Sequence, residues 1–354
     1  MLVSKICLTG GPCAGKTTAL TNIEQVLTNM GYKVFIINEC ATRLINAGVK
    51  SFGEDKIDYL MFQEFMLKNQ LLEEETFEKV ASIIDKKCII ICDRGIFDIR
   101  SYLNEEEFNM LLDKYNLSKL DLMDNYNLVI HLNTVAKGKP ELYTLDNNKA
   151  RKEGIKEAIL RDDLCENAWS FHNNLIIINN NTDFDNKINK IINVIKNDLG
   201  AKVQKQRKYL ISLNDDFINE IKKHECTKIK IIQTYLKYKD DYELRLRKRI
   251  LNNNETYYVS IRKSCNDESK IVAEEKINKK SYLELLNNNE ILNQVIKDRI
   301  NFIDNDNLYK IDIYNDGMCI LETSSNMVIP SFINVLKEVT GNDLYYNKNI
   351  KIMI

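Results

Sequence analysis

Hydrophobic and polar positions alternate in two different ways along the chain, and the change falls near residue 200. Before it, short apolar runs are separated by longer amphipathic stretches. The apolar runs are typical of strands buried on both faces of a parallel sheet; they are LVSKICLT, YKVFIIN, KKCIIIC, DNYNLVIHL and NNLIIIN. The stretches between them, such as GKTTALTNIEQVLTNMG and EDKIDYLMFQEFMLKNQLLEEETFEKVAS, are helical in pattern. Strands joined by helices predict a doubly wound α/β domain with a parallel sheet and right-handed connections.

After Gly200 hydrophobic residues recur at every second position, with charged residues in the positions between them. This pattern predicts an antiparallel sheet with one apolar and one polar face. The segments that show it are QKQRKYLIS, KIKIIQTYLK, YELRLRKRI, ETYYVSIRK, KIVAEEKI, NLYKIDIY and MCILETSS. We therefore predict two domains: an α/β domain over residues 1–199 and an α+β antiparallel barrel over residues 200–354.

Composition excludes some classes of protein. The chain has 354 residues, of which 44% are hydrophobic and 29% charged, with a formal net charge of −1. This balance is typical of a globular protein and gives no reason to expect a nucleic-acid partner. No apolar run is long enough for a transmembrane helix, and no secretory leader is visible. Nine cysteines without a C-x-x-C pair favour buried thiols in a reducing compartment, so we expect a cytoplasmic protein.

The first strand ends in a glycine-rich turn that carries the clearest chemistry. Residues Gly10 to Thr17 match G-x-x-x-x-G-K-[ST], follow a predicted strand and open a predicted helix. This is the structural context of a phosphate-binding loop, in which backbone N–H groups and the helix N-terminus hold phosphate oxygens. Lys16 should reach the β- and γ-phosphates, and the Thr17 hydroxyl should coordinate Mg²⁺. The residues expected to contact the nucleotide here are Gly10, Gly11, Pro12, Cys13, Ala14, Gly15, Lys16, Thr17 and Thr18.

Polar residues also follow the second and third strands, and ligands of such folds bind at the carboxyl ends of the strands. Asp93 could hold Mg²⁺ or accept a proton, or else cap a helix. Glu39 is a candidate base for a substrate hydroxyl, or a cap of the next helix. Arg43 could clamp a phosphate, or lie on a solvated helix face. Asp98 is a candidate for binding the phosphoryl acceptor.

Two further regions complete the predicted site. The loop after the fifth strand, with Asn180 and Asp183, should lie beside the base of the nucleotide. A charged helical segment precedes that strand and has the length of a lid. Its Arg151 and Arg161 could stabilise charge on a transferred phosphoryl group, or lie exposed on the helix. His131 fits a core histidine better than a base.

These motifs together resemble a known family. GGPCAGKTT, NECATRLI, CDRGIFD, DNYNLVIHL, LYTLDNNKAR and NNNTDFDNKI resemble, in order and spacing, the P-loop domain shared by bacterial nicotinamide-riboside kinases and the animal TRPL translocation defect protein. The resemblance runs from about Leu2 to Leu199 and implies a nucleoside-kinase-like fold that binds ATP or GTP with Mg²⁺. LYTLDNN is closer to the translocation-defect branch, which is similar to regulators that bind GTP and phosphatidic acid. The fold alone therefore does not establish a kinase.

Basic residues recur at alternate positions in the second half. Arg245, Arg247 and Arg249 share one face of a predicted strand, and Lys297 with Arg299 share a face of another. A single row of this kind is typical of a solvated face. Several rows in one domain favour a cationic barrel interior that binds polyphosphate or phosphate headgroups.

This half resembles the CYTH, or triphosphate-tunnel, superfamily. The matching stretches are QRKYLI, IIQTYLK, LRLRKR, IVAEEKI, IKDR, KIDIY and ILE, over about Ala201 to Glu322. The resemblance implies anion contacts from Lys208, Arg245, Arg247, Lys297 and Arg299, with Arg262 and Lys263 as further candidates.

The sequence departs from this family at its metal site. Catalytic members open with Glu-x-Glu-x-Lys, whereas this chain has Gln204 and Gln206 before Lys208. A neutral amide cannot replace a carboxylate in holding Mg²⁺. Glu274, Asp312 and Glu322 remain as acidic candidates, but we expect triphosphatase activity to be lost or weak.

Three functions stay open. The first is an Mg²⁺-dependent phosphotransferase or NTPase whose second domain binds a phosphate-rich anion. The second is a nucleotide-dependent switch that binds GTP and an anionic phospholipid, without kinase activity. The third, a tunnel triphosphatase, is opposed by the two glutamines. The sequence leaves both ATP and GTP, and the acceptor, open.

Overall fold

The computed structural model describes residues 3–143, 154–200, 206–224, 226–239, 242–265, 268–324 and 327–350, and describes side chains in these ranges except at 264–265 and 268–272. The chain divides into two compact units, Met1–Lys196 and Asn197–Ile354. We refer to them as the first and the second unit.

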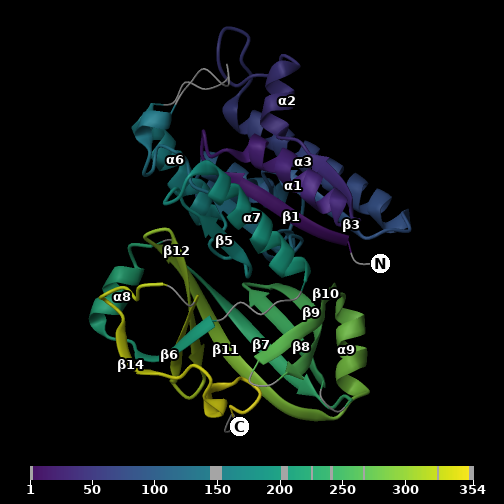
Figure 1. Cartoon of the computed structure of the whole chain (residues 1–354), viewed down its shortest axis with the longest axis vertical. Coiled ribbons are helices and arrows are strands. Elements are labelled where there is room, and N and C mark those ends of the chain that lie inside the picture. The colour runs from purple at the N-terminus through teal and green to yellow at the C-terminus, as the bar shows by residue number, and fades with distance from the viewer. Residues whose placement is uncertain are drawn as a thin grey trace. The chain divides into compact units, whose positions relative to one another are not determined.

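The first unit is built on a five-stranded parallel sheet (Figure 1). Its order is β2-β3-β1-β4-β5, with every neighbouring pair parallel. The strands are β1 (Val3–Gly10), β2 (Lys33–Ile37), β3 (Cys88–Asp93), β4 (Leu128–Leu132) and β5 (Leu175–Ile178). The α/β fold predicted from the sequence is confirmed.

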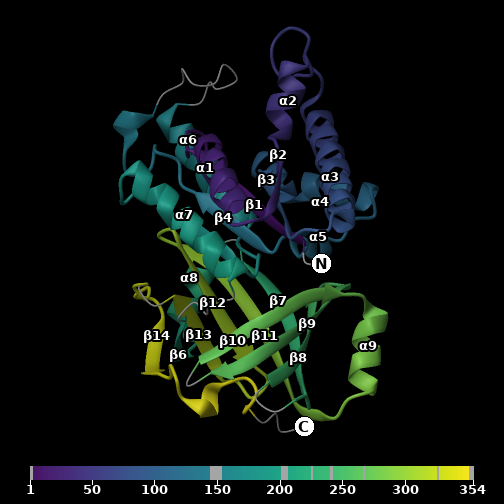
Figure 2. The ribbon, with the colours of Figure 1, turned by 45° about the vertical axis from the view of Figure 1, so that its right-hand side comes forward.

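Helices cover both faces of this sheet, with α1 and α7 on one face and α3 and α4 on the other (Figure 2). Their bounds are α1 (Lys16–Asn29), α2 (Cys40–Asn46), α3 (Tyr59–Ile83), α4 (Glu105–Lys114), α5 (Lys119–Met123), α6 (Ile155–Ala168) and α7 (Phe184–Leu199). Two short 3₁₀ segments are η1 (Ile96–Tyr102) and η2 (Pro140–Leu142). Helix α3 begins five residues later than the pattern predicts, because the Asp58 side chain accepts the N–H of Met61 and caps the helix there.

The order of the strands decides where a ligand can bind. The central strand β1 pairs with β3 on one side and β4 on the other, so the loops after these strands meet at one edge of the sheet. All of β3 and β4 is buried, and so is β1 from Lys5 onward. The polar residues that follow these strands are therefore held by a rigid apolar core.

The second unit is a nine-stranded antiparallel sheet of order β10-β9-β8-β7-β11-β12-β13-β6-β14. Its strands are β6 (Gln206–Ser212), β7 (Thr227–Leu236), β8 (Tyr242–Leu251), β9 (Asn254–Cys265), β10 (Glu268–Ile277), β11 (Ile291–Asp304), β12 (Asn307–Tyr314), β13 (Cys319–Ser324) and β14 (Asn334–Glu338). The antiparallel α+β class predicted from the alternating pattern is confirmed. The sheet is strongly curved (Figures 1 and 2).

Two helices of this unit, α8 (Asp215–Ile221) and α9 (Lys279–Asn287), were not predicted, and a 3₁₀ segment η3 (Asp343–Tyr345) follows β14. Asn214 caps α8 by accepting the N–H of Phe217, and Asn278 caps α9 by accepting the N–H of Ser281. Both helices are short, and each packs one aromatic side chain, Phe217 or Tyr282, against the sheet. Tertiary packing therefore sets these helices more than helical periodicity does.

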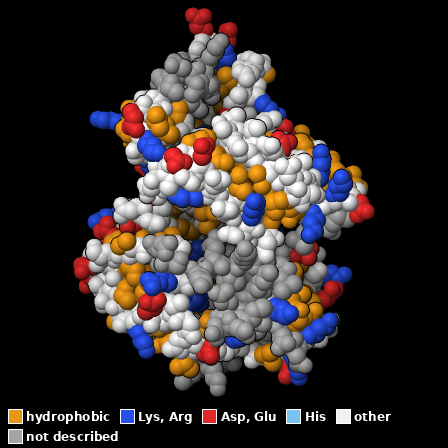
Figure 3. Space-filling model, in the orientation of Figure 1, with side chains coloured by type: hydrophobic (Ala, Val, Ile, Leu, Met, Phe, Trp, Pro, Cys, Tyr) orange, Lys and Arg blue, Asp and Glu red, His pale blue; other side chains and the backbone are white. Residues whose placement is uncertain are grey.

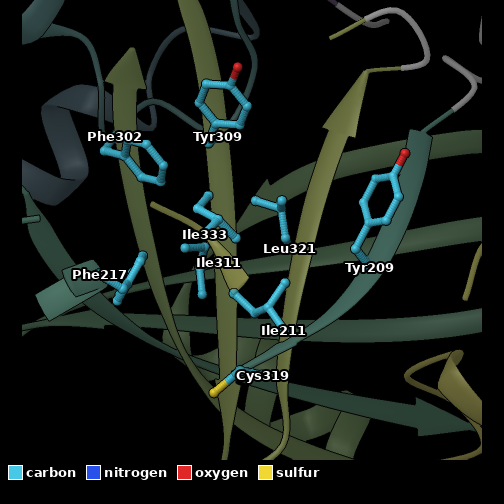
Figure 4. Packing of buried hydrophobic residues seen from close by; sticks show 9 residues of the cluster. All are labelled: Tyr209, Ile211, Phe217, Phe302, Tyr309, Ile311, Cys319, Leu321 and Ile333. Carbon is cyan, nitrogen blue, oxygen red and sulfur yellow. The ribbon is translucent and has the colours of Figure 1, made fainter. Parts of the chain in front are cut away.

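One face of the second sheet carries its main apolar core. Figure 4 shows the larger cluster, in which Phe302, Tyr309 and Ile311 from neighbouring strands meet Phe217 of α8 and Ile333. The rings of Phe302 and Tyr309 are stacked with centroids 5.1 Å apart. A second cluster joins Leu244, Leu246 and Tyr257 to Tyr282 of α9. Because side chains alternate along a strand, the neighbouring residues must point to the opposite face.

This core yields a stability prediction. Phe302 is 1% exposed, and Phe302→Ala should destabilise the second unit by about 3–5 kcal/mol, because it removes buried apolar area and leaves a cavity. Denaturant-dependent hydrogen exchange of β11 and β12 would measure the loss. The matched control is Leu336→Ala on β14. The Leu336 side chain is 57% exposed, so removing it should change the stability of the unit by less than about 0.5 kcal/mol. Equal effects of the two changes would contradict this packing.

Candidate functional site

The glycine-rich loop needs glycine at two of its positions. It leaves β1 at Gly10 and enters α1 at Lys16, as predicted. Gly10 and Gly15 have φ values of 144° and 87°, which side chains rarely adopt. A Cβ atom on Gly10 would lie 2.1 Å from the carbonyl oxygen of Leu132. The ammonium of Lys16 donates to the carbonyls of Gly10 (3.1 Å) and Gly11 (3.3 Å) and so lies over the loop.

Helix α6 holds the start of this loop. Asp162 is fully buried, and its Oδ1 accepts the backbone N–H of Gly11 at 2.7 Å and that of Thr134 at 3.1 Å. The hydroxyl of Thr134 in turn donates to the carbonyl of Pro12, and Val135 N–H donates to Cys13. The first half of the loop is therefore fixed by side chains from other elements.

Further polar side chains lie around Asp162. His131 Nε2 lies 3.3 Å from Asp162 Oδ1 and 3.6 Å from Glu166 Oε2. These three side chains are close enough together to hold a metal ion. However, the ammonium of Lys137 already lies among the carboxylates, 2.9 Å from Asp162 Oδ2. We therefore interpret this cluster as an ion-pair network that fixes α6 to β4.

Glu39 and Asp93 lie at the carboxyl ends of β2 and β3, near Lys16, but in different environments. Glu39 accepts from Arg94 Nε at 2.5 Å and from the hydroxyl of Thr42. Its side chain does not cap α2. Although burial disfavours its charge, Arg94 and Lys16 outweigh that effect and lower the pKa of Glu39 to about 2.

Asp93 shows the opposite shift. Burial raises its pKa, and Glu39 adds to the rise, while Lys16 opposes it. Its Oδ1 is buried and has no hydrogen-bond partner among the described residues. Lys16 has a lowered pKa through burial and the repulsion of Arg94. The arrangement therefore has an unpaired carboxylate oxygen and a destabilised ammonium, both of which Mg²⁺ and phosphate would satisfy.

The other predicted residues of the first unit are mostly engaged by the chain itself. Thr17 and Thr18 are exposed at the start of α1. Arg43 is paired with Glu73 at 2.5 Å. Asp98 accepts from the Thr9 hydroxyl through Oδ1 and from the Gly95 N–H through Oδ2 at 2.7 Å.

Arg161, one of the two predicted lid arginines, is engaged by the chain itself. Arg161 donates to the carbonyl of Ser101, and its guanidinium lies 4.2 Å from the centre of the Tyr102 ring. It therefore packs against η1. Arg151 lies outside the described residues.

The loop after β5 contacts the loop after β4. Asn180 is buried, and its amide donates to the carbonyls of Asn133 (3.3 Å), Thr134 (2.7 Å) and Lys137 (2.9 Å). Asp183 accepts the N–H of Asn186 and begins α7. Both residues thus shape the loops in which sequence reasoning placed the nucleotide base.

Sequence reasoning missed Arg94, Asp162 and Lys187 as contributors to this site. Arg94 lies directly after Asp93, and its positive φ of 72° turns its side chain toward Glu39. Asp162 and Lys187 lie far along the chain from the loop that they contact. The local sequence pattern does not indicate such contacts. The one available signal is a lysine within the apolar stripe of α7, which indicates a buried amine that needs partners.

In the second unit, the strand register brings the predicted basic residues to one face. On β7, Gln233 pairs with Arg247 of β8, while Ile231 and Ile229 pair with Lys297 and Arg299 of β11. Across β12 and β13, Asp312 lies opposite Arg299, and Glu322 lies opposite Lys208 of β6. Side chains on this polar face are buried, including Gln233, Arg245, Arg247, Arg249, Thr256, Ser260, Lys297, Asn301, Asp312 and Glu322.

The three acidic candidates of the polar face, Glu274, Asp312 and Glu322, are each paired with cations. Asp312 accepts two bonds from Arg299, at 2.6 and 2.7 Å, and lies 2.5 Å from the ammonium of Lys297. Glu322 pairs with Arg299 at 2.7 Å and with Lys208 at 3.3 Å. Glu274 pairs with Arg247 at 2.9 Å and Arg245 at 3.2 Å.

Several cations of this face carry an electrostatic cost of burial. Burial lowers the pKa of Lys297 to about 8, despite Asp312 beside it, and lowers that of Lys310 to about 8. Burial likewise lowers the pKa of Arg245 and of Arg247, and Arg262 and Arg245 add to these shifts. The Nε atom of Arg247 is buried without a hydrogen-bond acceptor in the described part of the chain. An anion bound here would relieve this electrostatic cost.

The outer surface is different. On the face drawn in Figure 3, basic and acidic side chains are interspersed. Among the described residues, no helix is long and apolar enough to cross a membrane.

Comparison with known proteins gives a family for the first unit. The search of curated proteins found no match. Among solved structures, the chain is similar to the PH1819 protein of Pyrococcus horikoshii, with 17% identity over 36% of this chain and 80% of that chain, at a TM-score of 0.27. It is also similar to the PH1012 protein of the same organism, with 16% identity over 34% of this chain and 80% of that chain, at a TM-score of 0.27. A conserved hypothetical protein from Pyrococcus furiosus has 14% identity over 36% of this chain and 80% of that chain, at a TM-score of 0.26. Structural similarity this weak carries no argument.

A family model described as an AAA domain (AAA_28) matches residues 5–187, which include the glycine-rich loop, the ends of β2 and β3, and α6. This match spans more than half of the chain. The first unit is therefore an AAA-type P-loop domain that binds a nucleoside triphosphate with Mg²⁺, and the chain belongs to this AAA domain family.

Proposed function

We propose that this protein is an Mg²⁺-dependent phosphotransferase or NTPase whose second unit binds a phosphate-rich anion. The observation that carries the proposal is the electrostatic environment that Lys16 and Asp93 share at the end of β3. The ammonium has a lowered pKa and the carboxyl a raised one, and Asp93 Oδ1 is buried without a partner among the described residues. Phosphoryl transfer depends on positioning and on charge compensation of this kind.

The two carboxylates of the site suit different roles. Glu39 is held ionised between Arg94 and Lys16, so it is a weak base and a good orienting group. Asp93 is the better candidate for holding Mg²⁺, directly or through water, together with Thr17. It is also the better proton acceptor, because its pKa is raised.

A nucleotide-dependent switch is the second candidate function, and one observation favours it. The side chains expected to bind an acceptor or the phosphoryl group, Arg43, Asp98 and Arg161, are each engaged by the chain itself. In this arrangement an acceptor would have to displace these contacts. A protein that binds GTP and an anionic phospholipid without transferring phosphate would need no acceptor site.

The proposed role of the second unit rests on its polar face. We propose that this face is the anion site of a CYTH-like fold, with Lys208, Arg245, Arg247, Lys297 and Arg299 as contacts. Glu274, Asp312 and Glu322 are ion-paired with arginine or lysine, so they are poor ligands for a divalent cation. Together with Gln204 and Gln206, which stand in the sequence where catalytic members of that superfamily have glutamates, this supports binding without triphosphate hydrolysis.

The following experiment tests the proposed function. The full-length protein is incubated with Mg²⁺ and γ-labelled ATP or GTP, together with pools of nucleosides, ribosides and small metabolites. Transfer of label to one acceptor identifies a kinase and its substrate, and steady release of labelled phosphate identifies an NTPase. Tight nucleotide binding with neither product would contradict the enzyme and support the switch.

The phosphate loop makes a direct prediction. Lys16→Ala should weaken binding of Mg²⁺-nucleoside triphosphate at least about tenfold, because a charge-assisted contact to phosphate is lost. Isothermal titration calorimetry measures the change. Lys33→Ala is the control, since Lys33 is exposed at the opposite, amino-terminal end of β2. Unchanged affinity of Lys16→Ala would contradict the role given to Lys16.

The polar face makes a second prediction. Replacing both Arg245 and Arg247 with alanine should weaken tripolyphosphate binding more than about tenfold and leave nucleotide binding at the phosphate loop unchanged. Calorimetry in a Lys16→Ala background isolates the second unit. The matched control replaces Lys228 and Lys230, which are exposed on the opposite face of β7.

Two outcomes would oppose this account of the second unit. Loss of affinity in the Lys228/Lys230 control, but not in the arginine variant, would place the anion on the outer face. Rapid metal-dependent hydrolysis of tripolyphosphate in the Lys16→Ala background would show an active triphosphatase instead of a binding site.

A further inference from the structure

A buried lysine lies directly behind the phosphate loop. Lys187 on α7 is 3% exposed. Its ammonium donates to the carbonyl of Ala14 at 3.2 Å, the carbonyl of Asn133 at 2.9 Å and Oδ1 of Asn180 at 2.7 Å. Three acceptors match the three N–H donors of an ammonium, so the group is fully hydrogen-bonded.

All three acceptors are neutral, which is unusual for a buried charge. The charged groups that act on Lys187 come from three other parts of the unit: Asp162 of α6, Lys16 of α1 and Lys139 after β4. Burial is the largest effect, the two lysines add to it, and Asp162 opposes it, so the pKa of Lys187 falls to about 8. Among the described residues, neutral oxygens and the more distant Asp162 therefore compensate its positive charge only in part.

The contact with Ala14 fixes the direction of the loop. A phosphate loop must point its N–H groups toward the ligand and its carbonyls away from it. The carbonyl of Ala14 points to Lys187, and the next residue, Gly15, has the left-handed conformation that begins α1. Phe184, one helical turn before Lys187, packs so closely that a Cβ on Gly15 would lie 2.6 Å from its ring. The first turn of α7 thus supports the loop on two sides.

We propose that Lys187 is a positioning residue of the triphosphate site: it holds the Ala14 carbonyl away from the ligand and supplies a second positive charge behind the loop, in addition to Lys16. This inference rests on nucleotide binding by the loop and is independent of whether phosphate is transferred.

A pH dependence follows from this arrangement. Triphosphate brings negative charge close to Lys187, so binding should raise the pKa of Lys187 above its free value of about 8. The complex then favours the protonated lysine. Affinity is fully present below the free pKa and falls as the pH rises through it, and binding near pH 8 takes up a proton.

The test measures binding of Mg²⁺ with a non-hydrolysable ATP or GTP analogue by calorimetry between about pH 6.5 and 9.5. Two buffers with different ionisation enthalpies give the number of protons taken up. The wild type should lose affinity above about pH 8 by close to tenfold per pH unit, with proton uptake. Lys187→Met should bind about tenfold more weakly at pH 7 and lose this pH step.

Two further variants keep the test decisive. Lys187→Arg retains a charge that does not titrate, so it should bind at pH 7 within a few-fold of the wild type but without the pH step. Lys190→Met, at an exposed position of α7, should behave as the wild type does. If Lys187→Met fails to fold, the pH dependence of Lys187→Arg and the proton uptake of the wild type still test the role of Lys187.

Retention of the pH step in either Lys187 variant would assign it to another group, such as Lys16, and overturn the proposal. So would a folded Lys187→Met variant with unchanged affinity, or a wild type that takes up no proton near pH 8. Failure of the wild type to bind any nucleotide would instead overturn the phosphate-loop assignment on which the proposal rests.

Discussion

Buried positive charge is the constraint on which both units depend. An ammonium or guanidinium removed from water is costly unless a carboxylate, several acceptors or a ligand compensates it. In the first unit, Lys16 and Lys187 are stabilised mainly by neutral carbonyl and amide oxygens. In the described part of the second unit, arginines and lysines share a buried face with Glu274, Asp312 and Glu322. We propose that an anion completes both arrangements.

The way in which carboxylates are distributed separates the two sites. In the first unit, Glu39 neutralises Arg94, while Asp93 keeps an oxygen without a partner among the described residues. We propose that this oxygen contacts the Mg²⁺ of the bound nucleotide. On the polar face of the second unit, Asp312 and Glu322 are bridged by one guanidinium, that of Arg299. This difference is the basis for proposing a metal–phosphate complex in the first unit and an anion without metal in the second.

Much of the fold could be predicted from the sequence, because its determinants are local. The loop from Gly10 to Thr17 has a fixed spacing, and continuous apolar runs such as that of β3 identify buried parallel strands. Alternation along β8 correctly placed Arg245 and Arg247 on one face. The helices α8 and α9 were missed, because each is short and is held by the packing of one aromatic side chain.

The parts of the site that the sequence could not predict depend on long-range contacts. Asp162 meets the N–H of Gly11 across 151 positions of the chain, and Lys187 meets the carbonyl of Ala14 across 173. The pairing of Arg43 with Glu73 depends on how α2 packs on α3. Whether the arginine face of β8 is solvated or buried depends on the curvature of the whole sheet. None of these is encoded in a motif.

Hydrogen exchange of the full-length protein, measured by mass spectrometry with and without two ligands, tests the central claim most directly. A non-hydrolysable Mg²⁺-nucleotide should slow exchange in the loop from Gly10 to Thr18 and the start of α1. Tripolyphosphate without metal, added to the nucleotide-bound protein, should slow exchange in β7, β8, β11 and β12. Two separate protected regions would support an anion-completed site in each unit. Tripolyphosphate that leaves the second unit unchanged would contradict it.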